Sequence, residues 1–588
     1  MVAQNLLLLL VLAPFVAALL AATLPIGARN AECWLAGLTM VLALVVLAVL
    51  YPQVTNGGSV VTRLRWIDSV GLNLTFRIDG FSWLFMVLVA GIGFLVILYA
   101  RYYMSPEDPV ARLYSSLLAF AGAMSGLILS GNIIMLVVFW ELTSLVSFLL
   151  IGYWYHRQDA RDGARMSLIV TATGGLCLLV AMILIGQIAG SYDLETVLKA
   201  GPQITSHRLY PVTLILFILG AFTKSAQFPF HFWLPNAMAA PTPVSAYLHS
   251  ATMVKAGVFV LLRLHPALGG TTEWFQIVTG TGLVTLLMGA VIALFKHDLK
   301  GLLAYSTISH LGLITALAGI GTPLALIAAV FHIVNHATFK ASLFMAAGII
   351  DHETGTRDLR RLSGLWQAMP ITGTLAFVAS AAMAGVPLMN GFLSKEMFFA
   401  ETVHLGRNPV LDVGLPIVAT LAGIFAVVYS LRLAVGVFLG PPAIDLPLRP
   451  HEPPRWMRAP IEVLVLVCLL VGVLPQWAIG AALELAARPV VGGAMPVYSL
   501  AIWHGVNKPL LMSLVALAGG VALFLWGRRR LTAGRAGVMA LPAWLDGQLL
   551  FQRLLLGLDQ ASRGALRRLS TPRLQPQILV VVLAAIVL

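Results

Sequence analysis

The chain has 588 residues, of which 59% are hydrophobic and only 10% are charged, and its mean hydropathy is +0.91. This composition excludes a soluble globular domain and predicts an all-α protein that crosses a lipid bilayer many times. The formal net charge of +13 does not indicate a nucleic-acid partner, because the basic residues gather in alternate loops instead of one patch.

The N-terminal part contains two apolar segments and then a segment of different character. The first apolar run, Leu6–Leu24, has no basic residues before it and is soon followed by a second that begins near Cys33. We therefore expect a retained helix and not a signal peptide. From Thr55 to Gly80 the helical period is lost, and apolar and polar residues alternate over Leu72–Ile78. This pattern predicts a small external β-hairpin.

Apolar segments of about 20 residues, enough to cross a hydrocarbon core of about 30 Å, recur along the rest of the chain. We predict roughly fifteen spans in total, and a last one from Ile578 that looks truncated at Leu588. The predicted third to fifteenth spans are Phe81–Tyr103, Leu113–Gly131, Ile133–Tyr155, Ala164–Gly190, Tyr210–Phe232, Thr242–Leu264, Trp274–Phe295, Leu302–Ile320, Pro323–Ile350, Met369–Thr402, Val413–Gly440, Ile461–Leu483 and Ile502–Trp526.

Leucines between Leu541 and Leu569 fall on one helical stripe, and charged residues dilute the hydrophobicity. This pattern predicts an amphipathic helix along the cytoplasmic interface. The basic residues of alternate loops predict a bacterial inner-membrane protein with these loops in the cytoplasm and the N-terminus outside. These loops contain Arg101 and Arg112; Arg157, Arg161 and Arg165; Lys296 and Lys300; Arg357, Arg360 and Arg361; Arg449, Arg455 and Arg458; and Arg528, Arg529 and Arg530.

The three cysteines, Cys33, Cys177 and Cys468, are far apart in the sequence. They form no CxxC motif and no Cys/His cluster, which leaves no ligand set for an iron–sulfur cluster, structural zinc or a disulfide framework. We therefore expect no cofactor and no electron transfer within the chain.

Charged residues inside the predicted spans are the candidate functional residues. A charge at bilayer depth costs at least about 2.5 kcal/mol, so each one is a functional hypothesis. Glu141, Lys224, Lys255 and Lys395 lie in such positions. For Glu141 and Lys224 the functional interpretation is much stronger than a packing role. Lys255 could extend toward the interface, and Lys395 could form a local ion pair with Glu396.

His332, His336 and Lys340 are spaced i, i+4 and i+8. A helix therefore places them on one face, about 6 Å apart. Imidazoles that titrate near neutral pH, within reach of a lysine, suit a proton relay. His249 and His310 taken alone are as consistent with helix packing as with proton transfer, and haem or metal ligation by His332 and His336 is improbable.

Prolines accompany two of these lysines: Pro229 follows Lys224, and Pro387 precedes Lys395. A proline within a membrane helix removes a backbone hydrogen bond, and the break is tolerated mainly where it lines a polar cavity. Paired broken helices in two halves of a chain are typical of inverted repeats around an ion path.

Four motifs resemble a known superfamily: Trp140–Ser144, Lys224–Met238, Ala240–Gly257 and Phe331–Ala341. They are similar to motifs of the antiporter-like proton-pumping subunits of respiratory complex I and its relatives. Within that superfamily, residues 351–365 and the motif around Lys255 look most like the large A subunit of the Mrp-type multisubunit cation/proton antiporters. That subunit usually continues past a segment like Ile578–Leu588 into further helices, so we expect the part that would carry the second half of its assembly to be absent here.

The resemblance implies two inverted five-helix repeats with broken helices and assigns roles to the candidate residues. It implies an ion-paired switch of Glu141 with Lys224 and a link through Lys255 and His249. It further implies a central relay of His332, His336 and Lys340, and Lys395 as the exit lysine. The implied division of the chain is 1–112, 113–264 for the first repeat, 265–440 for the second, 441–535, 536–577 for the amphipathic helix and 578–588.

The function expected from the sequence is that of a proton-translocating subunit of a Na⁺/H⁺ antiporter, working with other membrane subunits. The alternative is a proton-pumping subunit of a complex I-like oxidoreductase or membrane-bound hydrogenase. A purely structural anchor is hard to reconcile with so many intramembrane charges. The site of Na⁺ binding is not evident from the sequence.

Overall fold

A computed structural model of the chain describes residues 2–25, 27–67, 71–403, 409–532, 547–569 and 574–587. Helices dominate, because a backbone in lipid must satisfy its polar groups within its own segment. Among the described residues, 13 helices are long and apolar enough to cross a membrane. The protein is thus an all-α polytopic membrane protein, as the composition predicts. The chain divides into two units, 1–537 and 538–588.

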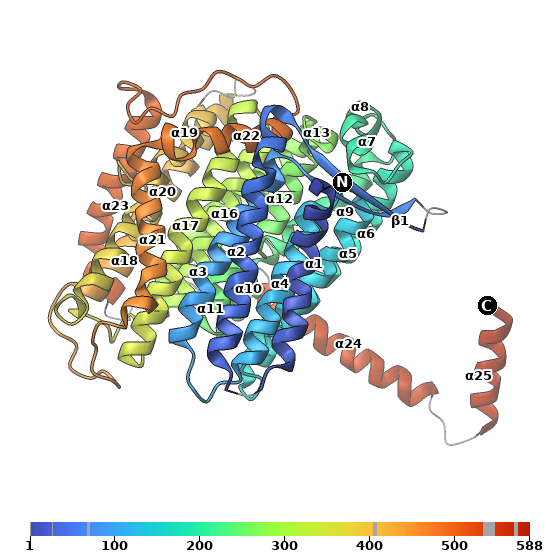
Figure 1. Ribbon diagram of the computed structural model, residues 1–588, viewed down its shortest axis with the longest axis horizontal. Helices are drawn as coiled ribbons and strands as arrows, with labels where there is room; N and C mark the ends of the chain where they lie inside the picture. The colour runs from blue at the N-terminus through green and yellow to red at the C-terminus, as the bar shows by residue number, and fades with distance from the viewer. Residues whose placement is uncertain are drawn as a thin grey trace. The chain divides into compact units, whose positions relative to one another are not determined.

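The larger unit contains the hairpin and most of the helices (Figure 1). Its helices up to Leu268 are α1 (Val2–Thr23), α2 (Arg29–Val54), α3 (Gly80–Tyr103), α4 (Val110–Leu129), α5 (Ile133–Ile151), α6 (Gln158–Ala189), α7 (Leu194–Lys199), α8 (Gly201–Thr205), α9 (Tyr210–Lys224), α10 (Trp233–Asn236), α11 (Thr242–Ser250), α12 (Lys255–Arg263) and α13 (His265–Leu268). Those that follow are α14 (Thr272–Trp274), α15 (Gly280–Phe295), α16 (Leu299–Ile320), α17 (Pro323–Thr354), α18 (Pro370–Ala384), α19 (Asn390–Val403), α20 (Pro409–Phe438), α21 (Arg455–Val473), α22 (Ala481–Val491) and α23 (Lys508–Thr532).

Three predicted spans are interrupted. The predicted span Tyr210–Phe232 ends as a regular helix at Lys224, and Met369–Thr402 is divided into α18 and α19 by residues 385–389. Both breaks lie beside the prolines that predict them, Pro229 and Pro387. The third break, at residues 251–254 between α11 and α12, is not predicted from the sequence, because no proline or glycine marks it.

Two predicted spans near the C-terminus have wrong boundaries. The predicted span Ile461–Leu483 ends as α21 at Val473, and α22 follows after one π-helical turn. Pro475 explains the end of α21, since the residue before a proline disfavours the helical conformation. The predicted span Ile502–Trp526 begins only at Lys508, since residues 492–507 form no regular structure.

The predicted β-hairpin is confirmed. Strands β1 (Val60–Ile67) and β2 (Leu72–Ile78) pair antiparallel, with Val60 opposite Ile78 and a bulge between Leu64 and Ile67. Alternation of apolar and polar residues gives the two strands the period of two that a half-buried hairpin needs. Asp79 follows β2 directly and caps the start of α3, where its side chain accepts a hydrogen bond from the backbone N–H of Ser82.

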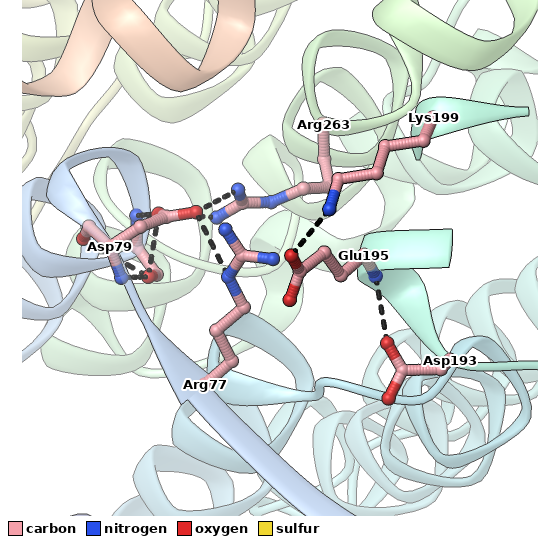
Figure 2. Close-up of polar contacts among 7 residues, drawn as sticks. Arg77, Asp79, Asp193, Glu195, Lys199 and Arg263 are labelled. Carbon is pink, nitrogen blue, oxygen red and sulfur yellow. Dashed lines mark hydrogen bonds and ion pairs between the residues drawn. The ribbon is translucent and has the colours of Figure 1, made fainter. Parts of the chain in front are cut away.

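A buried ion pair fastens the start of α3 to the end of α12. Asp79 accepts hydrogen bonds from Arg263 at 2.6 and 3.0 Å, and the two side chains are 4% and 3% exposed (Figure 2). Arg77 lies 3.7 Å from the same carboxylate. Burial alone would raise the pKa of Asp79, but the charge and hydrogen bonds of Arg263, with Arg77 nearby, hold that pKa below its usual range.

Asp79→Asn should destabilise the protein by about 3–5 kcal/mol, because it leaves the Arg263 guanidinium buried without a counter-charge. The matched control is Glu195→Gln, which removes an exposed pair with Lys199 (2.8 Å, Figure 2) and should cost at most about 1 kcal/mol. Urea unfolding of the purified protein, followed by tryptophan fluorescence, measures both.

The lowered pKa of Asp79 also fixes the pH dependence of this stabilisation. The stabilisation by ionised Asp79 is present in full above about pH 4, the pKa of an aspartate in the unfolded chain. It is lost as the pH falls from there through the lower pKa that Asp79 has in the folded protein. The difference between wild type and Asp79→Asn should therefore be constant between about pH 6 and pH 8. Equal losses in the two variants, or a difference that changes in this window, would contradict the assignment.

The smaller unit contains α24 (Gly547–Leu569) and α25 (Leu574–Val587). In α24, leucines line one side and Asp559 pairs with Arg563 one turn on, at 3.0 Å, as the predicted amphipathic helix requires. Residues 541–546 of that prediction lie outside the described residues. The predicted final apolar segment is helical as α25 and is one of the shorter apolar helices.

Candidate functional site

Glu141 lies in the middle of α5 and faces α6. The helix begins at Asn132, whose side-chain oxygen accepts hydrogen bonds from the backbone N–H groups of Ile134 and Met135 at 2.9 and 3.3 Å. Gly175 of α6 leaves the space that the glutamate fills, since a Cβ atom there would lie 1.5 Å from Glu141 Oε1. That oxygen is buried and has no hydrogen-bond partner in the described part of the chain. Glu141 is therefore a half-buried residue with one carboxylate oxygen buried against α6.

Lys224, the last residue of α9, is fully buried against α5. Its Nζ donates to Ser144 Oγ at 2.6 Å and to the carbonyl oxygen of Trp140 at 3.1 Å. It also lies 5.1 Å from the centroid of the Trp140 ring. Trp140 and Ser144 flank Glu141 on the same helix, but no direct ion pair joins Lys224 to Glu141 among the described residues. The ion pair that the resemblance implies between Glu141 and Lys224 is thus not formed in this structure.

Lys255 begins α12 directly after the break at residues 251–254 and is fully buried. Its Nζ lies 2.9 Å from His336 Nδ1 of α17, so it reaches into the bundle and does not extend toward the interface. His249, at the end of α11, lies between aromatic rings, with centroids 6.5 Å from Trp233 and 6.2 Å from Phe344. Its two ring nitrogens have no hydrogen-bond partner within the described ranges, so a direct link to Lys255 is not formed.

His332 and His336 of α17 lie within hydrogen-bond distance of side chains on other helices, whereas no hydrogen bond joins the two rings to each other. The rings of His332 and His336 have centroids 6.4 Å apart, as their spacing predicts. His332 Nε2 lies 2.9 Å from His310 Nδ1 of α16, and His332 Nδ1 lies 2.9 Å from Ser394 Oγ of α19. The His310 ring lies 5.3 Å from that of His336. His310 therefore stands between the two predicted histidines.

Lys340 and Lys395 approach one another across the break between α18 and α19. Lys340 Nζ donates to Ser306 Oγ and lies 3.2 Å from the Met383 sulfur. Lys395 Nζ donates to the carbonyl oxygens of Met383 and Ala384 at 2.7 and 3.0 Å. These carbonyls are exposed by the end of α18, and a cation is favoured at a helix C-terminus. The alternative of a local ion pair between Lys395 and Glu396 is wrong in this structure.

The structure places two further residues, His310 and Lys300, among the buried polar contacts, although the sequence does not single them out. His310 is a single histidine in an apolar helix, and nothing in its local sequence separates relay from packing. The pattern of basic loops places Lys300, in the first turn of α16, in the cytoplasm, but it is buried and donates to the carbonyl oxygen of Ala240 at 2.8 Å. Its position so close to the end of an apolar segment is the signal that could have identified it.

The contacts form a polar line through the centre of the bundle. Lys255 contacts His336, and His310 contacts both His332 and the hydroxyl of Tyr429, at 3.3 Å. The rings of His336 and His310 lie 5.3 Å apart, but no hydrogen bond joins them, since His336 Nε2 has no partner in the described structure. Buried imidazoles that exchange hydrogen bonds can accept and donate a proton in turn. No group of three or more His, Cys, Asp or Glu that could hold a metal is found in the part of the chain that the structure describes. The chemistry that this line supports is proton transfer.

Gly175→Ala should lower transport at least about tenfold, because the new Cβ atom would overlap the position of Glu141 Oε1 and displace the carboxylate. Gly91→Ala is the matched control, since a Cβ atom on that membrane-helix glycine meets no atom within 4 Å and alanine favours the helix. Proton flux in vesicles, normalised to the amount of inserted protein, measures both. Loss of transport in both variants to the same extent would contradict this role of Gly175.

Comparison with known proteins identifies related sequences. The family described as "NADH:quinone oxidoreductase/Mrp antiporter, TM" matches residues 130–418, and "NADH-Ubiquinone oxidoreductase (complex I), chain 5 N-terminus" matches residues 66–114. The chain is 59% identical to a Rhizobium meliloti protein named as the probable A/B subunit of a K(+)/H(+) antiporter, over 99% of this chain and 58% of that protein. It is 39% identical to a Bacillus subtilis protein named as the A subunit of a Na(+)/H(+) antiporter, over 100% of this chain and 76% of that one.

Solved structures of related proteins have a similar fold. A chain of the Mrp complex from Dietzia sp. matches with a TM-score of 0.86 and 33% identity, over 100% of this chain and 62% of that chain. A chain of respiratory complex I from Thermus thermophilus matches with a TM-score of 0.71 and 25% identity, over 83% of this chain and 100% of that chain. The chain thus spans about three fifths of the Rhizobium and Dietzia proteins. With these identities and coverages, the chain belongs to the family of the large A subunits of Mrp-type cation/proton antiporters.

Proposed function

We propose that this chain is the proton-translocating subunit of a multisubunit antiporter that exchanges protons for a monovalent cation. The observation that carries the proposal is the buried line of Lys255, His336, His310 and His332, which has no role in a simple membrane anchor. Support for the exchanged cation comes from the relatives: the Rhizobium protein is named for K⁺ and the Bacillus protein for Na⁺. The exchanged ion is therefore K⁺ or Na⁺.

The residues take the following roles in the proposal. Glu141 and Lys224 form a switch that closes when Lys224 leaves Ser144 and Trp140 and pairs with the carboxylate. Lys255 and His249 connect the two half-channels, and His332, His336 and Lys340 form the central relay together with His310. Lys395 passes the proton to the exit. The two repeats, 113–264 and 265–440, each supply one half-channel.

The proposed orientation places the basic loops in the cytoplasm of a bacterial cell and the hairpin outside the inner membrane. Since consecutive spans run in opposite directions, the end of α19, the start of α17 and residues 492–507 then lie on the outer side, toward the upper edge of Figure 1. The partners are other membrane subunits of the same complex, supported by the likeness to the Mrp complex of Dietzia.

The test uses the complete complex that contains this chain, reconstituted into liposomes. With a proton gradient imposed, addition of Na⁺ or K⁺ should dissipate the gradient, and choline should not. The alternative, a redox-driven pump of the complex I type, predicts no cation-dependent flux and proton movement only when an electron donor and a quinone are supplied. That second result would refute the antiporter proposal.

A further inference from the structure

A cavity of about 270 Å³ opens beside α19, next to Lys395. One wall is the face of α19 that carries Glu396 and Glu401, and another is the irregular segment 497–507 with the start of α23. Tyr498, Ser499, His504 and Asn507 of this segment also line it. A cavity of this size holds several water molecules. It is separate from the polar line described above.

Glu396 is the feature of this cavity that calls for a ligand. Its side chain lines the cavity, yet the residue is only 8% exposed. Within the described ranges it makes no hydrogen bond and no ion pair. The neighbouring Lys395 does not neutralise it, because the lysine donates instead to the carbonyls at the end of α18. A buried carboxylate without a partner is costly, so it requires either a proton or a cation.

The other groups around the cavity offer oxygen ligands. Glu401 accepts a hydrogen bond from the hydroxyl of Thr322, which fixes one of its oxygens at the rim of the cavity. Ser499 Oγ and Asn507 Oδ1 each accept one backbone hydrogen bond, from Ala501 and Leu510 at 3.1 and 2.8 Å, and each has a second lone pair. With the phenol of Tyr498, they add neutral oxygens. Hard cations prefer carboxylate, amide and hydroxyl oxygens together with water. The cavity therefore combines one carboxylate that makes no ion pair, although the side chain of His504 lies near enough to act on it electrostatically, with the ligand chemistry of an alkali-metal ion.

We propose that this cavity binds a hydrated monovalent cation, Na⁺ or K⁺, at Glu396. The role of the site as the outer cation site of an antiporter rests on the proposed function and orientation. Binding there places a positive charge one residue along the helix from Lys395. Because like charges oppose one another, an occupied site favours the deprotonated form of that lysine, and a protonated lysine weakens cation binding. Exchange of a cation for a proton requires that cation binding and lysine protonation disfavour each other in this way.

The first experiment measures binding on the wild-type complex in detergent, without transport. A hydrophobic carbodiimide modifies buried carboxyl groups in their protonated form, and mass spectrometry of the peptides follows modification of Glu396. Na⁺ or K⁺ should slow this modification at least about tenfold, relative to choline at the same ionic strength. Glu32, a second buried carboxyl group whose oxygens have no hydrogen-bond partner in the described structure, is the internal control and should be modified at one rate throughout.

The second experiment measures cation-driven proton flux as a function of cation concentration on the outer side. Glu396→Gln should raise the half-saturating concentration at least about tenfold, and Glu396→Asp should restore much of the affinity. Glu195→Gln, which removes an exposed carboxylate at the same end of the bundle, should leave it unchanged. Comparison of Na⁺ with K⁺ in both experiments identifies which ion the site takes.

The outcomes separate this proposal from the proposed function. If neither cation slows modification of Glu396, the site binds only a proton and the proposal is overturned, even where the complex exchanges cations normally. If a cation protects Glu396 but the wild-type complex catalyses no exchange, the site stands and the antiporter function fails. A Glu396→Gln complex with the half-saturating concentration of wild type would also overturn the proposal.

Discussion

Lys224→Arg is expected to assemble normally with its partner subunits and to lose cation-driven proton flux by about 100-fold or more. Arginine remains protonated, because its pKa above about 12 cannot be brought into the working range by burial. Its guanidinium could still donate to Ser144 and to the carbonyl oxygen of Trp140, the two groups that hold Lys224. The substitution therefore keeps the charge and the contacts and removes only the release of the proton.

The matched control is Lys199→Arg, which makes the same change on an exposed lysine paired with Glu195 and should leave flux unchanged. Flux in vesicles, with assembly of the complex checked by co-purification, measures both variants. Near wild-type flux in Lys224→Arg would make Lys224 a fixed counter-charge for Glu141. The proton path would then have to run through Lys255 and the histidines alone.

The membrane spans and the hairpin are predictable because they depend on local composition. An apolar run of about 20 residues becomes a membrane helix largely irrespective of its neighbours, and the alternation in Leu72–Ile78 specifies a strand in the same local way. The breaks beside Pro229 and Pro387 are predictable for a similar reason, since proline acts on its own backbone. The break between α11 and α12 is not marked by such a residue; within the fold its carbonyl oxygen at Val254 accepts a hydrogen bond from the hydroxyl of Ser225, which follows α9, at 2.6 Å.

The individual residues of the site are predictable from the sequence, but their contacts are not. Glu141, Lys224 and Lys255 stand out because a charge in an apolar segment is costly wherever its partner lies. The partner is set by packing between helices. The i, i+4 spacing suggests that Lys340 follows His336 in one relay, yet the long side chain of Lys340 reaches Ser306 and Met383 instead. His310 gains its importance only when α16 packs against α17.

His310→Gln and His332→Gln are each expected to lower proton flux about 100-fold, and the double variant should be barely worse than either. The two rings share one hydrogen bond of 2.9 Å and lie 5.1 Å apart, nearly parallel. If a proton must pass through both, loss of either interrupts the same step, and residues that act as a unit are strongly non-additive. Glutamine keeps a polar side chain of similar reach but cannot relay a proton as imidazole does.

A control and a third substitution make this prediction specific. His156→Gln changes an exposed histidine outside the bundle core and should leave flux unchanged. Lys340→Ala removes a member of the same proposed relay, so combined with His310→Gln it should likewise be barely worse than either single variant. Multiplicative losses for His310 and His332 would show instead that they act separately, as packing residues. In that case the path from Lys255 would have to leave through His336 toward Lys340, along the face of α17 that the sequence indicates.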